Sequence, residues 1–233
     1  MKNIIILLSL IFLSSCQNKK VNCLNHFKFQ NAHDSIPIVN LDYIQNREDY
    51  IQQIKDAFDE DLCQKCEMVD YKIPFLFDGI PGHLKVMADF ETPDCGNCPV
   101  PVRERLLYFV SINTSDQLLV NSELLEKDSL ENNIVNYLNG IGSGNQDSPD
   151  RYNKFHFHVY WSKQANPEYV KEILGIISKA HLKFVIQRIN KVGDIFCHLT
   201  EKELYVWKDW YPLKLELSFG TKSFPPPLPP TNN

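Results

Sequence analysis

A strand–helix–strand pattern over Phe155–Arg188 is the feature that most constrains the fold of this chain. Apolar and polar residues alternate over Phe155–Trp161, which predicts a strand with one apolar and one polar face. Asn166 and Pro167 then suit the cap and the first position of a helix, and the β-prone run Phe184–Ile189 predicts a second strand. Between them lie apolar residues at helical spacing, namely Tyr169, Val170, Ile173, Leu174, Ile177 and Ala180. We expect a right-handed crossover with its two strands parallel in one sheet, and further elements that bury its apolar faces.

The N-terminus predicts export and lipid attachment. Lys2 precedes the apolar run Ile4–Leu13, which is shorter than the roughly 20 residues that span a bilayer and is typical of a secretory signal. The following residues Leu13-Ser14-Ser15-Cys16 resemble the lipobox of bacterial lipoproteins, which implies cleavage before Cys16 and fatty-acyl chains such as palmitate on its side chain. The alternative is an ordinary signal peptide in which Cys16 is incidental. We expect a protein of the cell envelope that is lipid-anchored and faces the periplasm.

Further elements follow from hydrophobic periodicity and turn residues. We expect a helix within Asn40–Phe58 and a second helix that starts at Asp128 or Ser129 and ends at Gly140. A third, short helix is expected to start at the capping-box pattern Thr200–Glu203. The expected strands are Tyr71–Phe77, His83–Phe90, Leu106–Ile112, Gln117–Asn121 and the half-exposed Leu213–Phe219. Ile141–Asn153 is predicted to be a loop, and Pro225–Pro230 an extended tail.

Residues Leu106–Asn190 give the order β-β-α-β-α-β, and this part resembles the periplasmic domain of the ExbD/TolR family. The similarity lies in the run YFVSINTSDQLLVNSELLEKDSLENNIVNYL, with its VSIN strand and LLVN return strand, and in the later helix that begins NPEYV. It covers somewhat over a third of the chain. It implies an α+β fold with a small sheet and two helices on one face, here preceded by a cysteine-rich α/β region.

The family's role sets the expected partners. Its members work in proton-driven membrane complexes, and their periplasmic domains dimerise and contact peptidoglycan or an energised partner protein. They carry a transmembrane helix with a functional Asp, whereas Met1–Cys16 contains no acidic residue, so the resemblance implies the fold and the binding role and not the motor. The expected division is a signal peptide at 1–15, a tether and cysteine-rich region at 16–105, the ExbD/TolR-like domain at 106–195 and a C-terminal extension at 196–233.

The cysteines are the strongest chemical signal. Once Cys16 is assigned to lipid, six of the seven remain, namely Cys23, Cys63, Cys66, Cys95, Cys98 and Cys197. An even number in an oxidising compartment favours disulfides. The CxxC pairs Cys63/Cys66 and Cys95/Cys98 also leave open a zinc site, although the 28 residues between them exceed the roughly 15–20 of the common spacing, or a redox-active thiol.

Other chemistry has little support in the sequence. His156 and His158 share one strand face, a spacing found in metal sites, but no third ligand is evident beside them. A net charge of −5 without a basic cluster argues against nucleic acid, and no phosphate loop or catalytic motif is present. We therefore predict no cofactor and a non-catalytic lipoprotein that binds a protein partner or peptidoglycan, in biopolymer transport or envelope maintenance, with a homodimer as a possible state. The alternative is a thiol-redox or zinc-dependent envelope protein that uses the CxxC pairs.

Overall fold

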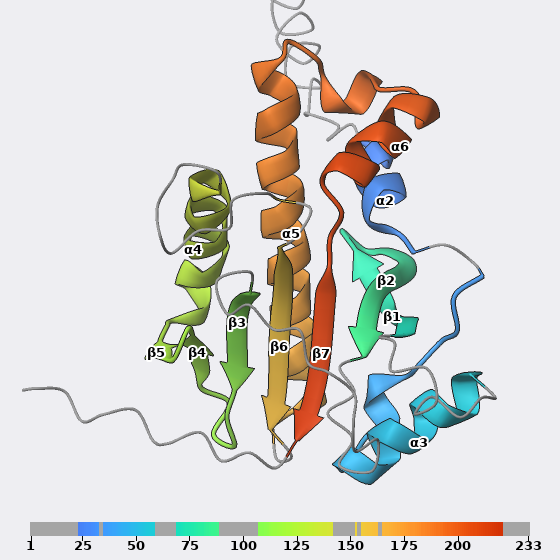
Figure 1. Ribbon diagram of the computed structural model, residues 1–233, viewed down its shortest axis with the longest axis vertical. Helices are drawn as coiled ribbons and strands as arrows, with labels where there is room; N and C mark the ends of the chain where they lie inside the picture. The colour runs from blue at the N-terminus through green and yellow to red at the C-terminus, as the bar shows by residue number, and fades with distance from the viewer. Residues whose placement is uncertain are drawn as a thin grey trace, which may run out of the picture.

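The protein is a mixed α/β structure organised around one seven-stranded sheet (Figure 1). The structure, a computed structural model, describes residues 23–32, 35–58, 69–88, 107–141, 152, 155–162 and 165–220. Across the sheet the strands follow the order β1-β2-β7-β6-β3-β4-β5. Their bounds are β1 Val69–Phe77, β2 Ile80–Ala88, β3 Leu107–Ile112, β4 Leu118–Val120, β5 Glu123–Leu124, β6 His156–Ser162 and β7 Leu215–Gly220.

Parallel strands form the centre of the sheet and antiparallel strands form its edges. β2, β7, β6 and β3 pair in parallel, while β1 adds to β2 and β4 and β5 add to β3 in antiparallel hairpins. The β1–β2 hairpin turns at Asp78 and Gly79, which both have positive φ, a conformation that glycine and aspartate tolerate. Parallel strands require covered faces, so the helices have to pack against this central part.

Helices α4 and α5 pack side by side against one face of the sheet (Figure 1). Lys127 of α4 pairs with Glu172 of α5, and Glu131 pairs with Lys179 and Lys183, so the two helices run in the same direction. The helices are α2 Leu24–Gln30, α3 Arg47–Phe58, α4 Lys127–Gly140, α5 Pro167–Lys191 and α6 Glu201–Trp210, with short 3₁₀ turns η1 Leu41–Tyr43 and η5 Phe196–His198.

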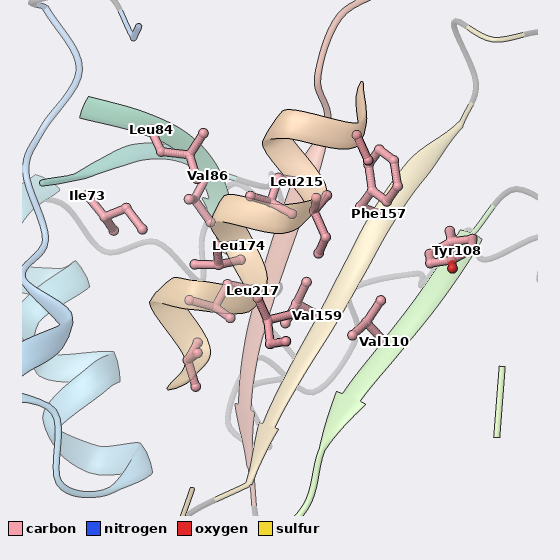
Figure 2. Packing of buried hydrophobic residues seen from close by; sticks show 14 of the residues in the cluster. Ile73, Leu84, Val86, Tyr108, Val110, Phe157, Val159, Leu174, Leu215 and Leu217 are labelled. Atoms are coloured by element: carbon pink, nitrogen blue, oxygen red, sulfur yellow. The ribbon is translucent and has the colours of Figure 1, made fainter. Parts of the chain in front are cut away.

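The core lies between this apolar face of the sheet and the helices, as Figure 2 shows. Val110 of β3, Val159 of β6 and Leu217 of β7 project toward the same side and are fully buried, and Leu174 of α5 packs against that side. The alternation predicted for Phe155–Trp161 is therefore confirmed, because its apolar members line the core.

Two helix starts also follow the predicted chemistry. The Asn166 side chain accepts a hydrogen bond from the Glu168 amide, and Pro167 is the first residue of α5. Thr200 and Glu203 form a complete capping box at α6. These side chains satisfy amides that the first helical turn leaves unpaired.

The predicted strand over Phe184–Ile189 is wrong, because these residues continue α5, which has 25 residues. Phe184, Val185 and Ile189 extend the buried stripe of the helix, and nothing between Lys179 and Lys191 interrupts it. The parallel neighbour of β6 is instead β7. The predicted small sheet and the order β-β-α-β-α-β within Leu106–Asn190 are corrected accordingly to a seven-stranded sheet that gains its last strand after α6.

The C-terminal strand was predicted to be half-exposed, and it is central instead. β7 lies between β2 and β6, and on the side opposite its apolar residues Glu216 is only 7% exposed, while Ser218 is half-buried. An alternating pattern is typical of a strand with one solvated face, and it cannot by itself show what covers the polar side.

Candidate functional site

A hydrogen-bonded polar cluster lies on the sheet face opposite the core. The carboxylate of Glu216 in β7 is hydrogen-bonded to both histidines of β6. Its Oε1 lies 2.8 Å from His156 Nδ1, and its Oε2 lies 3.1 Å from His158 Nδ1. On the other side of the His158 ring, Nε2 lies 3.1 Å from Ser218 Oγ. Phe109 of β3 stacks on His158, with ring centroids 5.1 Å apart and planes 16° from parallel. We call His156, His158, Glu216 and Ser218 the polar cluster.

Strand register builds this cluster. His158 is directly opposite both Phe109 and Glu216 in the parallel ladders, and Ser218 is two residues beyond Glu216 on the same face of β7. Cross-strand neighbours on one face lie close enough for side chains to interact. The apolar alternation that fills the core therefore also brings these polar side chains together.

Glu216 is ionised within the cluster. Burial alone would raise the pKa of its carboxyl, but the hydrogen bonds and the electrostatic effect of His156 and His158 lower that pKa to about 2. The chain of hydroxyl, imidazole and carboxylate in Ser218, His158 and Glu216 has the connectivity of a nucleophile, a base and a group that orients the base.

In the polar cluster the Nδ1 atoms of both histidines lie on the Glu216 carboxylate, and Nε2 of His158 lies next to Ser218 Oγ. Within the residues that the structure describes, the three-residue group with ligand atoms close enough for one metal ion is Cys23, His26 and Cys197. Cys23 and Cys197 are joined there as a disulfide, which leaves no thiolate for a metal.

The disulfide ties the start of the described chain to the segment that follows α5. Cys23 directly precedes α2, Cys197 lies in η5, and 174 residues separate them in sequence. Asn25 reinforces the junction, because its Nδ2 donates to the carbonyls of Phe196 and Leu199 at 2.9 Å each. The predicted presence of disulfides is thus confirmed for this pair.

A shallow groove of about 430 Å³, largely open to solvent, lies where α4 and α5 end. Among the described residues its lining is Asn139, Gln187, Asn190 and Lys191, and Asn139 Nδ2 lies 3.4 Å from Gln187 Oε1. Three carboxamides and one ammonium group can donate to and accept from peptide or sugar groups. We call this the amide groove.

A second buried polar group lies in α5. His181 is fully buried, and neither ring nitrogen has a hydrogen-bond partner within the described part of the chain. Its ring packs against those of Phe29 and Tyr152. Burial lowers the pKa of His181 to about 3, against the opposing effect of the nearby Tyr211 backbone, so the imidazole is neutral.

The structure tests only some of the predicted site residues. Cys16, Cys63, Cys66, Cys95 and Cys98 lie outside the described residues. His156 and His158 are described, and they meet a carboxylate that we did not assign from the sequence. The alternating sequence of β7 could have indicated this carboxylate, because it places Glu216 and Ser218 on the same face of the strand. In the described part of the chain, no helix is long and apolar enough to cross a membrane.

A search of the chain against protein families, curated proteins and solved structures finds no match. The resemblance to the ExbD/TolR family therefore stays a prediction.

Proposed function

We propose that this protein is a lipoprotein of the cell envelope, anchored through Cys16, whose ExbD/TolR-like domain faces the periplasm and binds a protein partner or peptidoglycan without catalysis. Its role is then in biopolymer transport or envelope maintenance, with a homodimer as one state. The observation that carries the proposal is the disulfide between Cys23 and Cys197.

Disulfides persist in exported proteins and are rare where thiol reductants dominate. The one described here begins only seven residues after Cys16, whose surroundings resemble a lipobox. Export is therefore supported by two independent features, namely the lipobox-like signal before Cys16 and a disulfide that requires an oxidising compartment. Two acyl chains hold a protein stably on a membrane.

The order of elements supports the family resemblance in a modified form. β3, β4, α4, β6, α5 and β7 follow one another as β-β-α-β-α-β, with β5 and α6 as additions and β7 in the place of the strand predicted within α5. In this form α4 and α5 still cover one face of the sheet, as the resemblance implies.

The amide groove is the surface we assign to the partner. Asn139, Gln187 and Asn190 offer both donors and acceptors, as a peptide backbone or a glycan requires, and the exposed Lys191 can pair with a carboxylate. Binding of this kind needs no nucleophile or general base, which fits a function without catalysis.

Two measurements test the proposal. Intact mass of the protein purified from membranes should show acyl chains, and Cys16→Ala should remove both the added mass and the membrane association. Cross-linking in cells followed by mass spectrometry should identify a partner whose yield falls in Lys191→Glu. The matched control is Lys202→Glu, an exposed lysine on α6 outside the groove. An unmodified Cys16, or equal yields in the two charge reversals, would contradict the proposal.

A second candidate function rests on the Ser218–His158–Glu216 relay. In an acyl-transfer reaction Ser218 Oγ would attack the acyl carbon while its proton passes to His158 Nε2, and the leaving alcohol would take that proton back. A fluorophosphonate probe tests it, since the Oγ–P bond forms as fluoride leaves. Labelling that disappears in Ser218→Ala would favour the enzyme, and absence of labelling in the folded protein would exclude this role for Ser218.

A further inference from the structure

We propose that the end of the molecule that carries the disulfide rests on the surface of the bilayer in which Cys16 is anchored. This inference depends on the lipid anchor proposed above and adds an orientation to it. We call this surface the disulfide end and define it by Cys23, Leu24, Val192, Ile195 and Cys197.

The disulfide end is a single place in the fold. Cys23 is bonded to Cys197, Leu24 is the next residue after Cys23, and Val192 caps the C-terminus of α5. η5 contacts both α2 and α5. In Figure 1 these segments gather at one extremity of the long axis, while β6 and β7 point their carboxyl ends toward the other.

The length of the tether decides which extremity can face the membrane. A fully extended chain spans at most about 3.6 Å per residue, so the seven residues from Cys16 to Cys23 reach about 25 Å. α5 lies along the long axis, and its 25 residues at 1.5 Å each extend about 37 Å. If the opposite extremity touched the bilayer, Cys23 would be too far from the membrane for Cys16 to remain inserted. The short tether excludes that orientation.

The side chains of the disulfide end suit a lipid surface. Leu24, Val192 and Ile195 are 55%, 63% and 57% exposed, although residues of this kind are usually buried. Apolar side chains gain free energy in the interface. The exposed Asp194 lies between Val192 and Ile195, so the charge of this end does not attract it to anionic lipid. The tether therefore selects this end, and its exposed apolar side chains allow contact with lipid.

Fluorescence quenching by lipid tests the orientation. The acylated protein is reconstituted in vesicles of phosphatidylethanolamine and phosphatidylglycerol that contain a phosphatidylcholine with a nitroxide near the headgroup. Ile195→Trp places a probe at the disulfide end. Tyr43→Trp places a matched probe in η1, which contacts α5 near Lys171 at the other extremity and where Tyr43 is 72% exposed. The parent protein supplies the signal of the natural tryptophans.

We expect the nitroxide lipid to remove most of the added fluorescence of Ile195→Trp and to leave that of Tyr43→Trp nearly unchanged. Equal quenching of the two probes, or stronger quenching of Tyr43→Trp, overturns the orientation while the anchor stands. A protein that does not float with the vesicles overturns both proposals, because the orientation requires the anchor.

Discussion

Acid should destabilise this protein through His181 before any carboxylate contributes. The imidazole is fully buried and neutral in the folded state, with its pKa lowered to about 3 from an ordinary value of 6.5. Below pH 6.5 the unfolded chain takes up a proton at His181 that the folded protein cannot accept. His181 therefore does not destabilise the folded protein above pH 6.5, and the free energy of unfolding falls as the pH drops from 6.5 toward 3. At pH 5 the loss is about 2 kcal/mol, from 1.36 kcal/mol per pKa unit.

The pH window isolates this group from the acidic ones. Glu216 has a lowered pKa of about 2, so its carboxylate contributes stability above pH 4.5 and loses it only between pH 4.5 and 2. Tyr152, which packs against His181, has its pKa raised by burial and stays neutral. Among the described groups whose pKa is shifted, His181 is the one whose protonation differs between the folded and unfolded states from pH 7 to 5. We therefore assign the pH dependence of stability in this range to His181.

The assay is urea unfolding followed by circular dichroism at pH 7 and pH 5, at fixed ionic strength and with the disulfide intact. His181→Leu is the perturbation, because leucine fills a similar volume and needs no hydrogen-bond partner. It should flatten the dependence between pH 7 and 5, while the exposed His198→Gln should keep the wild-type slope. Our reasoning fails if His181→Leu loses as much stability at pH 5 as the wild type does.

Three further predictions concern stability at single sites. Replacing Cys23 and Cys197 together by serine should lower the free energy of unfolding by up to about 5 kcal/mol, because the disulfide closes a loop of more than 170 residues; denaturant titration of the double variant measures this. Glu216→Gln should cost roughly 1–3 kcal/mol at pH 7 through weaker bonds to both histidines, and should abolish the extra loss of stability between pH 4.5 and 2 in an acid titration. Gly82→Ala should cost about 1–3 kcal/mol in thermal unfolding, since its Cβ would lie 2.7 Å from the Phe27 ring, and an unchanged melting temperature would refute that contact.

Local chemistry could be predicted from the sequence where a few neighbouring residues determine it. The cap at Asn166, the capping box at Thr200 and the alternation of β6 depend on contacts within one or two turns or on the pleat of a strand. The end of α4 at Gly140 belongs to the same class. Such features need no knowledge of the rest of the fold.

The errors came from tertiary context. Phe184–Ile189 is β-prone by composition, but the helical stripe that begins at Val170 continues through it and packs on the core, and this packing outweighs the local preference. No glycine or proline lies between Gly175 and Gly193, and this was the signal that the helix continues. Glu216 was missed because its partners lie on another strand, about 60 residues away in sequence. Only the register of β6 against β7 brings them together.

The amide groove lies at the same end of the molecule as the proposed membrane anchor, so the anchor limits which partners can reach the groove. Asn190 and Lys191 line the groove and directly precede Val192 of the disulfide end. If that end rests on the bilayer, the groove opens close to the headgroups, within reach of segments that protrude from the same membrane. This favours the exposed segment of a membrane protein over peptidoglycan. A photo-reactive residue at position 190 separates the two, since a product released by detergent alone indicates a membrane protein and one released only by muramidase indicates peptidoglycan.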